Sequence, residues 1–140
     1  MTATSPDTRT VRPVWKPRLA AVVAAVLANA LLGALAPLVG IDMLIAPPGQ
    51  PEGPVPLVAF VLFTTVFGLI GWGTFALAER VLGSRARLVW TIVAVVFTLV
   101  SFAPSMSVGG SAATEAVLLL SHVVVAAILI PVFWRTAADS

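Results

Sequence analysis

"TEAVLLLSHVVVAAILIPVFW", Thr114 to Trp134, decides the fold, because it is apolar over a length that crosses a lipid bilayer. A membrane helix needs about 20 mostly apolar residues, each rising about 1.5 Å, to cover a hydrocarbon core of about 30 Å. We therefore expect a transmembrane helix from Ala112 to Trp134. This segment also holds Glu115 near its start and the chain's only histidine, His122, at its middle.

The composition of the whole chain agrees with a lipid environment. Hydrophobic residues make up 59% of the sequence and charged residues 10%, whereas soluble domains average roughly 45–50% and about 25%. The calculated pI is near 10.5, but Lys and Arg flank apolar runs and do not gather on one helix or face, so we expect no nucleic-acid partner. With no cysteine and one histidine, we expect no metal and no cofactor.

Four segments have the length and composition of membrane spans. They cover residues 19–41, 55–78, 88–103 and 112–134. The third is short, but arginines before it can extend to the headgroups and Trp90 suits an interface. We predict an all-α integral membrane four-helix bundle over residues 19–134, with a disordered basic tail at 1–18 and a C-terminal tail at 135–140.

The basic residues predict how the chain crosses the membrane. All of them lie before the first span, between the second and third spans, or after the fourth, at Arg9, Arg12, Lys16, Arg18, Arg80, Arg85, Arg87 and Arg135. Cytoplasmic loops carry an excess of Lys and Arg. We therefore expect a multi-pass protein of the inner (plasma) membrane with both termini in the cytoplasm.

The first span admits one alternative. Basic residues, an apolar run and the small residues of Ala34–Ala36 also resemble a cleaved signal peptide, whose removal would leave three spans. Four uncleaved spans account for more of the pattern. The connection "IDMLIAPPGQPEGPVP", Ile41 to Pro56, is too rich in proline for a regular helix, and we expect Met43–Ile45 either to lie in the interface or to fold back over the bundle.

Small residues indicate where the helices pack. Lipid does not drive helix association as water does, so close backbone approach and polar contacts become the informative features. In the first span a small or polar residue recurs every four positions, and in the second span glycines form another thin region. The predicted packing residues are Ala21, Ala25, Asn29 and Gly33 in the first span, and Gly68, Gly71 and Gly73 in the second.

Asn29 and His122 lie near the centres of the first and fourth spans. Antiparallel spans would place them at similar depth, and each is costly if it faces lipid. We expect a hydrogen bond between them, or bonds from each to a threonine of the second or third span. The candidate threonines are Thr64, Thr65, Thr91 and Thr98.

Glu115 and His122 are seven residues apart, so they share one helix face with about 10 Å between their backbones along the axis. Ser111 is a plausible N-cap for this helix, and Glu115 in its first turn meets the positive end of the helix dipole. With Asp42 near the outer mouth, we predict a polar cavity lined by Asp42, Glu115, His122 and Asn29. No catalytic residue can be assigned.

Three longer pieces of the sequence carry a family resemblance. They are "VGIDMLIAPPG", "GWGTFALAERV" running into "SRARLVWTIVAVV", and "SFAPSMS" followed by "TEAVLLLSHVVVAAILIPVF". Together they resemble a group of small four-helix membrane proteins from actinobacteria that is catalogued as a domain of unknown function. The similarity spans about residues 19–133. It implies the same four-span architecture and, because that group has no assigned activity, no catalytic residue.

From these observations we expect a non-enzymatic protein. It would bind a lipophilic small molecule or a partner membrane protein, or form a homodimer, through a polar cavity open to the outer side. Two alternatives remain open, because an ionisable residue inside a span is a functional hypothesis in itself. One is an intramembrane isomerase, cyclase or hydrolase acting on a lipid-like substrate, and the other is a small proton-coupled exporter.

Overall fold

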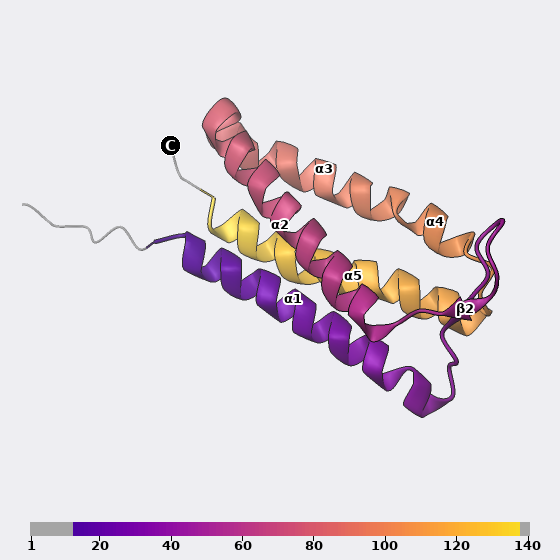
Figure 1. Cartoon of the computed structure of the whole chain (residues 1–140). Coiled ribbons are helices and arrows are strands. Elements are labelled where there is room, and N and C mark those ends of the chain that lie inside the picture. The colour runs from indigo at the N-terminus through magenta and orange to yellow at the C-terminus, as the bar shows by residue number, and fades with distance from the viewer. Residues whose placement is uncertain (1–12, 138–140) are drawn as a thin grey trace, which may run out of the picture.

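The computed structural model describes residues 13–137, and helices that lie side by side dominate it (Figure 1). The predicted tail residues 1–12, with Arg9 and Arg12, lie outside the described residues, as do residues 138–140. In chain order the elements are α1 (Trp15–Leu35), η1 (Pro37–Val39), β1 (Leu44–Ile45), β2 (Gly53–Pro54), α2 (Leu57–Leu82), η2 (Gly83–Arg85), α3 (Ala86–Val100), α4 (Phe102–Met106) and α5 (Ala112–Arg135).

Contacts among the helices α1, α2, α3 and α5 define their arrangement. α1 packs against α2 and α5, and α3 packs against the same two helices. Three helical segments are long and apolar enough to cross a membrane, namely Trp15–Val39, Leu57–Met106 and Ala112–Arg135. The middle one comprises α2, η2, α3 and α4, and it doubles back at η2, so that α3 runs antiparallel to α2 (Figure 1).

The boundaries of α1 differ from the prediction, which placed this span at 19–41. The helix begins at Trp15, so Lys16 and Arg18 belong to the helix and not to the tail. The helix ends at Leu35, since Pro37 lacks the N–H that would bond the carbonyl of Gly33.

The third predicted span, residues 88–103, is divided in the structure. α3 ends at Val100, and the short helix α4 starts at Phe102. Pro104 accounts for the break, because it has no N–H to donate to the carbonyl of Val100. By contrast, α5 begins at the predicted Ala112 and continues one residue beyond the predicted end, to Arg135.

The two ends of the helices differ in charge. One end, here called the basic end, holds the start of α1, the η2 turn and the end of α5 (Figure 1). It carries all the Lys and Arg side chains of residues 13–137. The other, here called the loop end, holds residues 36–56 and 107–111. There β1 and β2 form a short antiparallel ribbon in which Leu44 pairs with Pro54.

The buried apolar side chains form one cluster toward each end. At the basic end, the rings of Phe75, Trp90 and Phe133 contact one another with centroids 5.1 to 5.5 Å apart. That cluster extends along α1 through Ala21, Val22 and Ala25 to Leu129 of α5. The cluster toward the loop end consists of Ala36, Met43, Phe60 and Val117.

Candidate functional site

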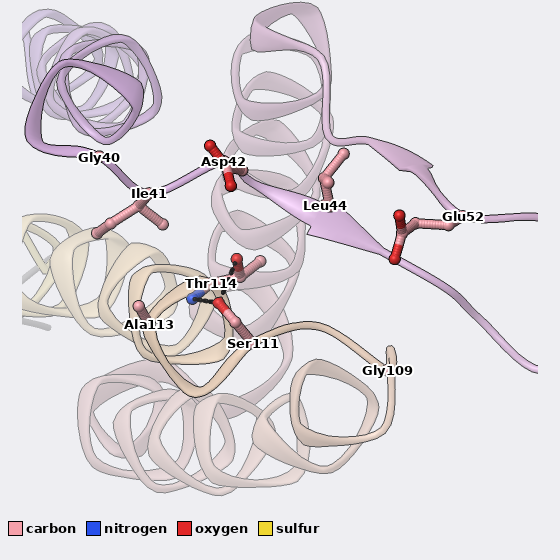
Figure 2. A pocket seen from close by; sticks show the side chains of 9 residues that line it. All are labelled: Gly40, Ile41, Asp42, Leu44, Glu52, Gly109, Ser111, Ala113 and Thr114. Carbon is pink, nitrogen blue, oxygen red and sulfur yellow. Dashed lines mark hydrogen bonds between the residues drawn. The ribbon is translucent and has the colours of Figure 1, made fainter.

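A hollow of about 220 Å³ opens at the loop end. It lies between the segment after η1, the ribbon of β1 and β2, and the start of α5 (Figure 2). Its lining residues are Gly40, Ile41, Asp42, Leu44, Glu52, Gly109, Ser111, Ala113 and Thr114. Asp42 precedes β1 and Glu52 precedes β2, so the two carboxylates come from separate segments of the connection (Figure 2).

Backbone contacts fix the wall of the hollow that precedes α5. The N–H of Ala46 donates to the carbonyl of Val108 at 2.8 Å, which ties this segment to the ribbon. Gly109 has a φ of +68°, and a Cβ there would lie 2.6 Å from the Ala46 carbonyl oxygen. Only glycine combines that backbone conformation with so close an approach.

The first turn of α5 completes the hollow. The predicted N-cap is confirmed, since Ser111 Oγ accepts a hydrogen bond from the N–H of Thr114 at 3.2 Å. The two hydroxyl groups are also 3.1 Å apart (Figure 2). Thr114 is 1% exposed, so its hydroxyl group is buried beside the hollow and held by Ser111.

Met43 holds the ribbon against the bundle. Its side chain is buried with Phe60 and Val117, and its carbonyl accepts a hydrogen bond from the N–H of Val55 at 2.8 Å. Of the two arrangements expected for Met43–Ile45, the structure thus has Met43 folded back over the helices. Leu44 is still 36% exposed.

The four residues predicted to line one cavity do not meet. Asp42 lines the hollow, but Glu115 in the first turn of α5 is not among the lining residues. His122 bonds within its own helix, where Nδ1 lies 2.7 Å from the carbonyl oxygen of Leu118. A carbonyl only accepts, so Nδ1 carries the proton. The imidazole also meets the ring of Phe102 edge-on at 6.5 Å.

Asn29, the fourth of these residues, is 3% exposed and lies between α1 and α2. Its Nδ2 donates to Thr64 Oγ1 at 2.8 Å, so it bonds one of the expected threonines and not His122. Among residues 13–137, the Asn29 Oδ1 has no hydrogen-bond partner. The contact therefore uses only half of the amide.

The predicted packing stripe of α1 faces its neighbours. Ala21 and Ala25 are buried, and a Cβ on Gly33 would lie 2.8 Å from the ring of Phe60. In α2, Gly68 lies against Val22, with 3.2 Å from its would-be Cβ to the nearest valine methyl. Gly71 likewise approaches Trp90 and accepts its indole N–H at 3.2 Å.

Gly73 differs from the other predicted packing residues. Nothing lies within 4 Å of the position that a Cβ would take there, so its assignment to a helix interface was wrong. The reason is geometric, because Gly71 and Gly73 are two residues apart and a helix turns by about 200° over two residues, at 3.6 residues per turn. The two glycines consequently lie on different faces of α2.

A buried polar cluster at the basic end was not predicted from the sequence. Arg18 is 3% exposed and binds both carboxylate oxygens of Glu79, at 2.7 and 2.8 Å. The same guanidinium donates to the hydroxyl and carbonyl oxygens of Thr136, at 3.0 and 2.6 Å. It also lies over the ring of Phe75 at 4.7 Å. These four residues, here called the Arg18 cluster, join α1, α2 and the end of α5.

One signal in the sequence pointed to the Arg18 cluster. Arg18 continues the stripe of Ala21, Ala25 and Asn29 at helical spacing, so its side chain starts on the buried face. An arginine on such a face needs an acidic partner. Glu79 is the only acidic residue between Val55 and the end of the third predicted span.

Chemically, the described residues offer binding groups more than reactive ones. No group of three or more His, Cys, Asp or Glu side chains within residues 13–137 could hold a metal ion. Several polar side chains within the helices, such as Asn29, Thr64 and His122, bond one another or their own backbone, while the hollow presents carboxylates and hydroxyls.

The fold and the apolar segments together define a small, mostly helical protein of a kind compatible with a membrane. The chain belongs to a family of unknown function, DUF6069, whose family model matches residues 9–139. No curated protein and no solved structure matches it.

Proposed function

We propose that the chain crosses the membrane four times, with both termini and η2 in the cytoplasm and the loop end outside. The support is the segregation of charge along the helices. Every described Lys and Arg lies at the basic end, whereas Asp42, Glu52 and Glu115 lie at the loop end. An excess of basic residues on the cytoplasmic side is the general rule for such proteins.

The absence of cysteine from the sequence allows a direct test of this topology. Single cysteines placed at Gln50, Ser84 and Ser107, which are all exposed, are treated with a membrane-impermeant maleimide on intact cells. We expect labelling of Gln50→Cys and Ser107→Cys, and labelling of Ser84→Cys only after the membrane is permeabilised. Labelling of Ser84→Cys from outside would contradict the proposed reversal at η2.

We further propose that the protein is a non-enzymatic binding protein whose site is the hollow at the loop end. The observation that carries this proposal is that segments distant in sequence line one hollow with both apolar and charged side chains. Ile41 and Leu44 supply apolar wall, while Asp42 and Glu52 supply negative charge. Such a lining suits an amphiphile that has a positively charged head.

The size of the hollow limits what enters it. Its volume of about 220 Å³ is below the roughly 300–1,000 Å³ of pockets that enclose a whole drug-sized molecule. The hollow therefore takes the amine head of a lipophilic molecule, whose chain follows the exposed apolar surface of the helices. Reaction at Glu115 and His122 is not part of this proposal, because neither lines the hollow.

The test uses dodecylamine as a cationic probe and dodecanol as its neutral counterpart. Native mass spectrometry of the purified full chain, released from an uncharged detergent, counts bound molecules of each. We expect adducts with the amine and few with the alcohol. The double variant Asp42→Asn/Glu52→Gln should reduce the amine adducts by about thirtyfold, since each of the two lost charges is worth roughly 1 kcal/mol in such a setting.

Glu115→Gln supplies the matched control. It removes a carboxylate from the same end without touching the lining of the hollow, so amine binding should change by less than about twofold. Equal losses in the control and in the double variant would mean that the whole acidic end attracts amines. That outcome would overturn the assignment to the hollow.

A further inference from the structure

We propose that the basic end carries a second site, for the headgroup of an anionic phospholipid. Its centre is the contact between Arg87 and Trp134. With the arginines nearest to them along the chain, Arg85 and Arg135, these residues are here called the arginine–tryptophan patch. These residues come from η2, the start of α3 and the end of α5. The site is separate from the hollow, which lies at the opposite end of the helices.

Arg87 and Trp134 give the patch its geometry. The guanidinium of Arg87 lies over the indole of Trp134, with 4.8 Å to the ring centroid. This contact brings the start of α3 beside the end of α5 and orders an arginine that would otherwise be free to move. Trp134 is 38% exposed, so the ordered pair remains on the surface.

The arginines of the patch keep their hydrogen-bond donors available. Within the described part of the chain, no hydrogen bond or ion pair engages the guanidinium groups of Arg85, Arg87 or Arg135. Glu79, the one described acidic residue of the basic end, accepts hydrogen bonds from Arg18 through both carboxylate oxygens. A guanidinium presents five N–H donors in a plane that matches an oxyanion such as phosphate.

The position of the patch selects a lipid as the source of that oxyanion. Directly after Arg87 the surface of α3 becomes apolar, with Leu88 57% and Ile92 54% exposed. The patch therefore lies at the border between a lipid-covered surface and the charged end of the bundle. The phosphate groups of lipids occupy this depth, and arginines near an anionic leaflet are attracted to it.

Local backbone adds to the attraction. No side chain caps the start of α3, and its first turn contains no acidic residue. The positive end of the helix dipole accordingly adds to the field of Arg85 and Arg87. The ammonium group of Lys16 lies over Trp15 of its own helix and not over Trp134, so we do not include it in the patch.

The experiment compares two lipids that differ only in the charge of the headgroup. The full chain in an uncharged detergent is titrated with phosphatidylglycerol or with phosphatidylcholine of the same acyl chains, and native mass spectrometry measures bound lipid. We expect the wild type to prefer phosphatidylglycerol. That preference should fall about fivefold in Arg87→Gln and about thirtyfold in Arg85→Gln/Arg87→Gln, at roughly 1 kcal/mol per arginine.

Lys16→Gln is the matched control. Lys16 is also an exposed cation beside a tryptophan at this end, with Nζ 5.8 Å from the ring centroid of Trp15. Its loss should change the preference by less than about twofold. Equal effects of Lys16→Gln and Arg87→Gln would overturn the patch in favour of general attraction, and a wild type without preference would overturn the site altogether.

A soluble headgroup separates a lipid from a free phosphate ester. Glycerol 1-phosphate is added as a competitor at the concentration of phosphatidylglycerol. We expect it to displace little lipid, because the acyl chains also bind the apolar surface beside the patch. Equal competition would assign the patch to soluble phosphate esters and overturn the lipid proposal. Asp42→Asn/Glu52→Gln should leave lipid binding unchanged, so this experiment tests the patch independently of the hollow.

Discussion

Charged residues are arranged differently at the two ends of the bundle. At the basic end, Arg18 of α1 is buried and its partners come from α2 and from the end of α5. At the loop end, Asp42 and Glu52 face an open hollow. The first arrangement joins helices, while the second leaves charge available to a ligand. Burial thus separates the charged residue that joins helices from the charged residues that we propose to bind a ligand.

The same contrast holds for the apolar contacts. The cluster of the basic end includes large aromatic rings of α2, α3 and α5 in direct contact. Toward the loop end, Phe60 and Val117 pack with Met43 from the connection itself. The ribbon that shapes the hollow is therefore held by one buried side chain and by backbone hydrogen bonds. We expect the loop end to open at a lower free energy than the basic end.

The largest effect that we predict comes from Arg18→Ala. It removes the guanidinium from a carboxylate that is only 17% exposed and removes two hydrogen bonds to Thr136. Breaking a buried ion pair by deleting one member costs about 3–5 kcal/mol. Denaturation with increasing SDS in mixed micelles, followed by circular dichroism, measures the loss.

Two further variants test whether the loss of stability comes from the broken buried ion pair. Lys16→Ala removes an exposed positive charge two residues away and should change stability by no more than about 0.5 kcal/mol. Arg18→Met/Glu79→Leu should recover most of the stability, because a buried pair replaced by apolar groups is often neutral. A loss in Arg18→Ala no larger than that in Lys16→Ala would show that the Arg18 cluster does not hold the basic end together.

Much of the helical architecture was predictable from the sequence, because long apolar segments are typical of helices that can cross a membrane. The stripe of Ala21, Ala25 and Asn29 was visible from its four-residue spacing, and the structure buries all three. The cap at Ser111 was likewise local, since it depends on residues within one turn. Proline effects were also local but were underestimated, as the end of α1 before Pro37 illustrates.

The candidate site was harder to predict, because it depends on where side chains point across loops. Asp42 and Glu115 lie at one end of the bundle, yet only Asp42 lines the hollow. That outcome depends on the path of the connection, which contacts at Gly109 and Met43 determine. His122 shows a different difficulty. A polar residue inside a helix can bond a carbonyl four positions earlier, and no sequence pattern distinguishes this from a bond to another helix.

Gly33→Ala probes the loop-end half of the comparison with a smaller expected effect. The added Cβ would lie 2.8 Å from the Phe60 ring, and that ring is only 6% exposed and packed against Met43 and Ala36. Overpacking of a filled interface costs about 1–3 kcal/mol. The same SDS titration measures it.

Gly73→Ala provides the control, because it makes the same chemical change where nothing lies within 4 Å of the new methyl group. It should be neutral or slightly stabilising, since alanine is favoured over glycine in a helix by about 0.5–1 kcal/mol. Equal behaviour of Gly33→Ala and Gly73→Ala would mean that Phe60 can move aside. The loop-end cluster would then be loose enough for the hollow to change shape when a ligand enters. A loss confined to Gly33→Ala would instead indicate that the hollow rests on a close-packed base, so that its selectivity depends on the side chains of the connection.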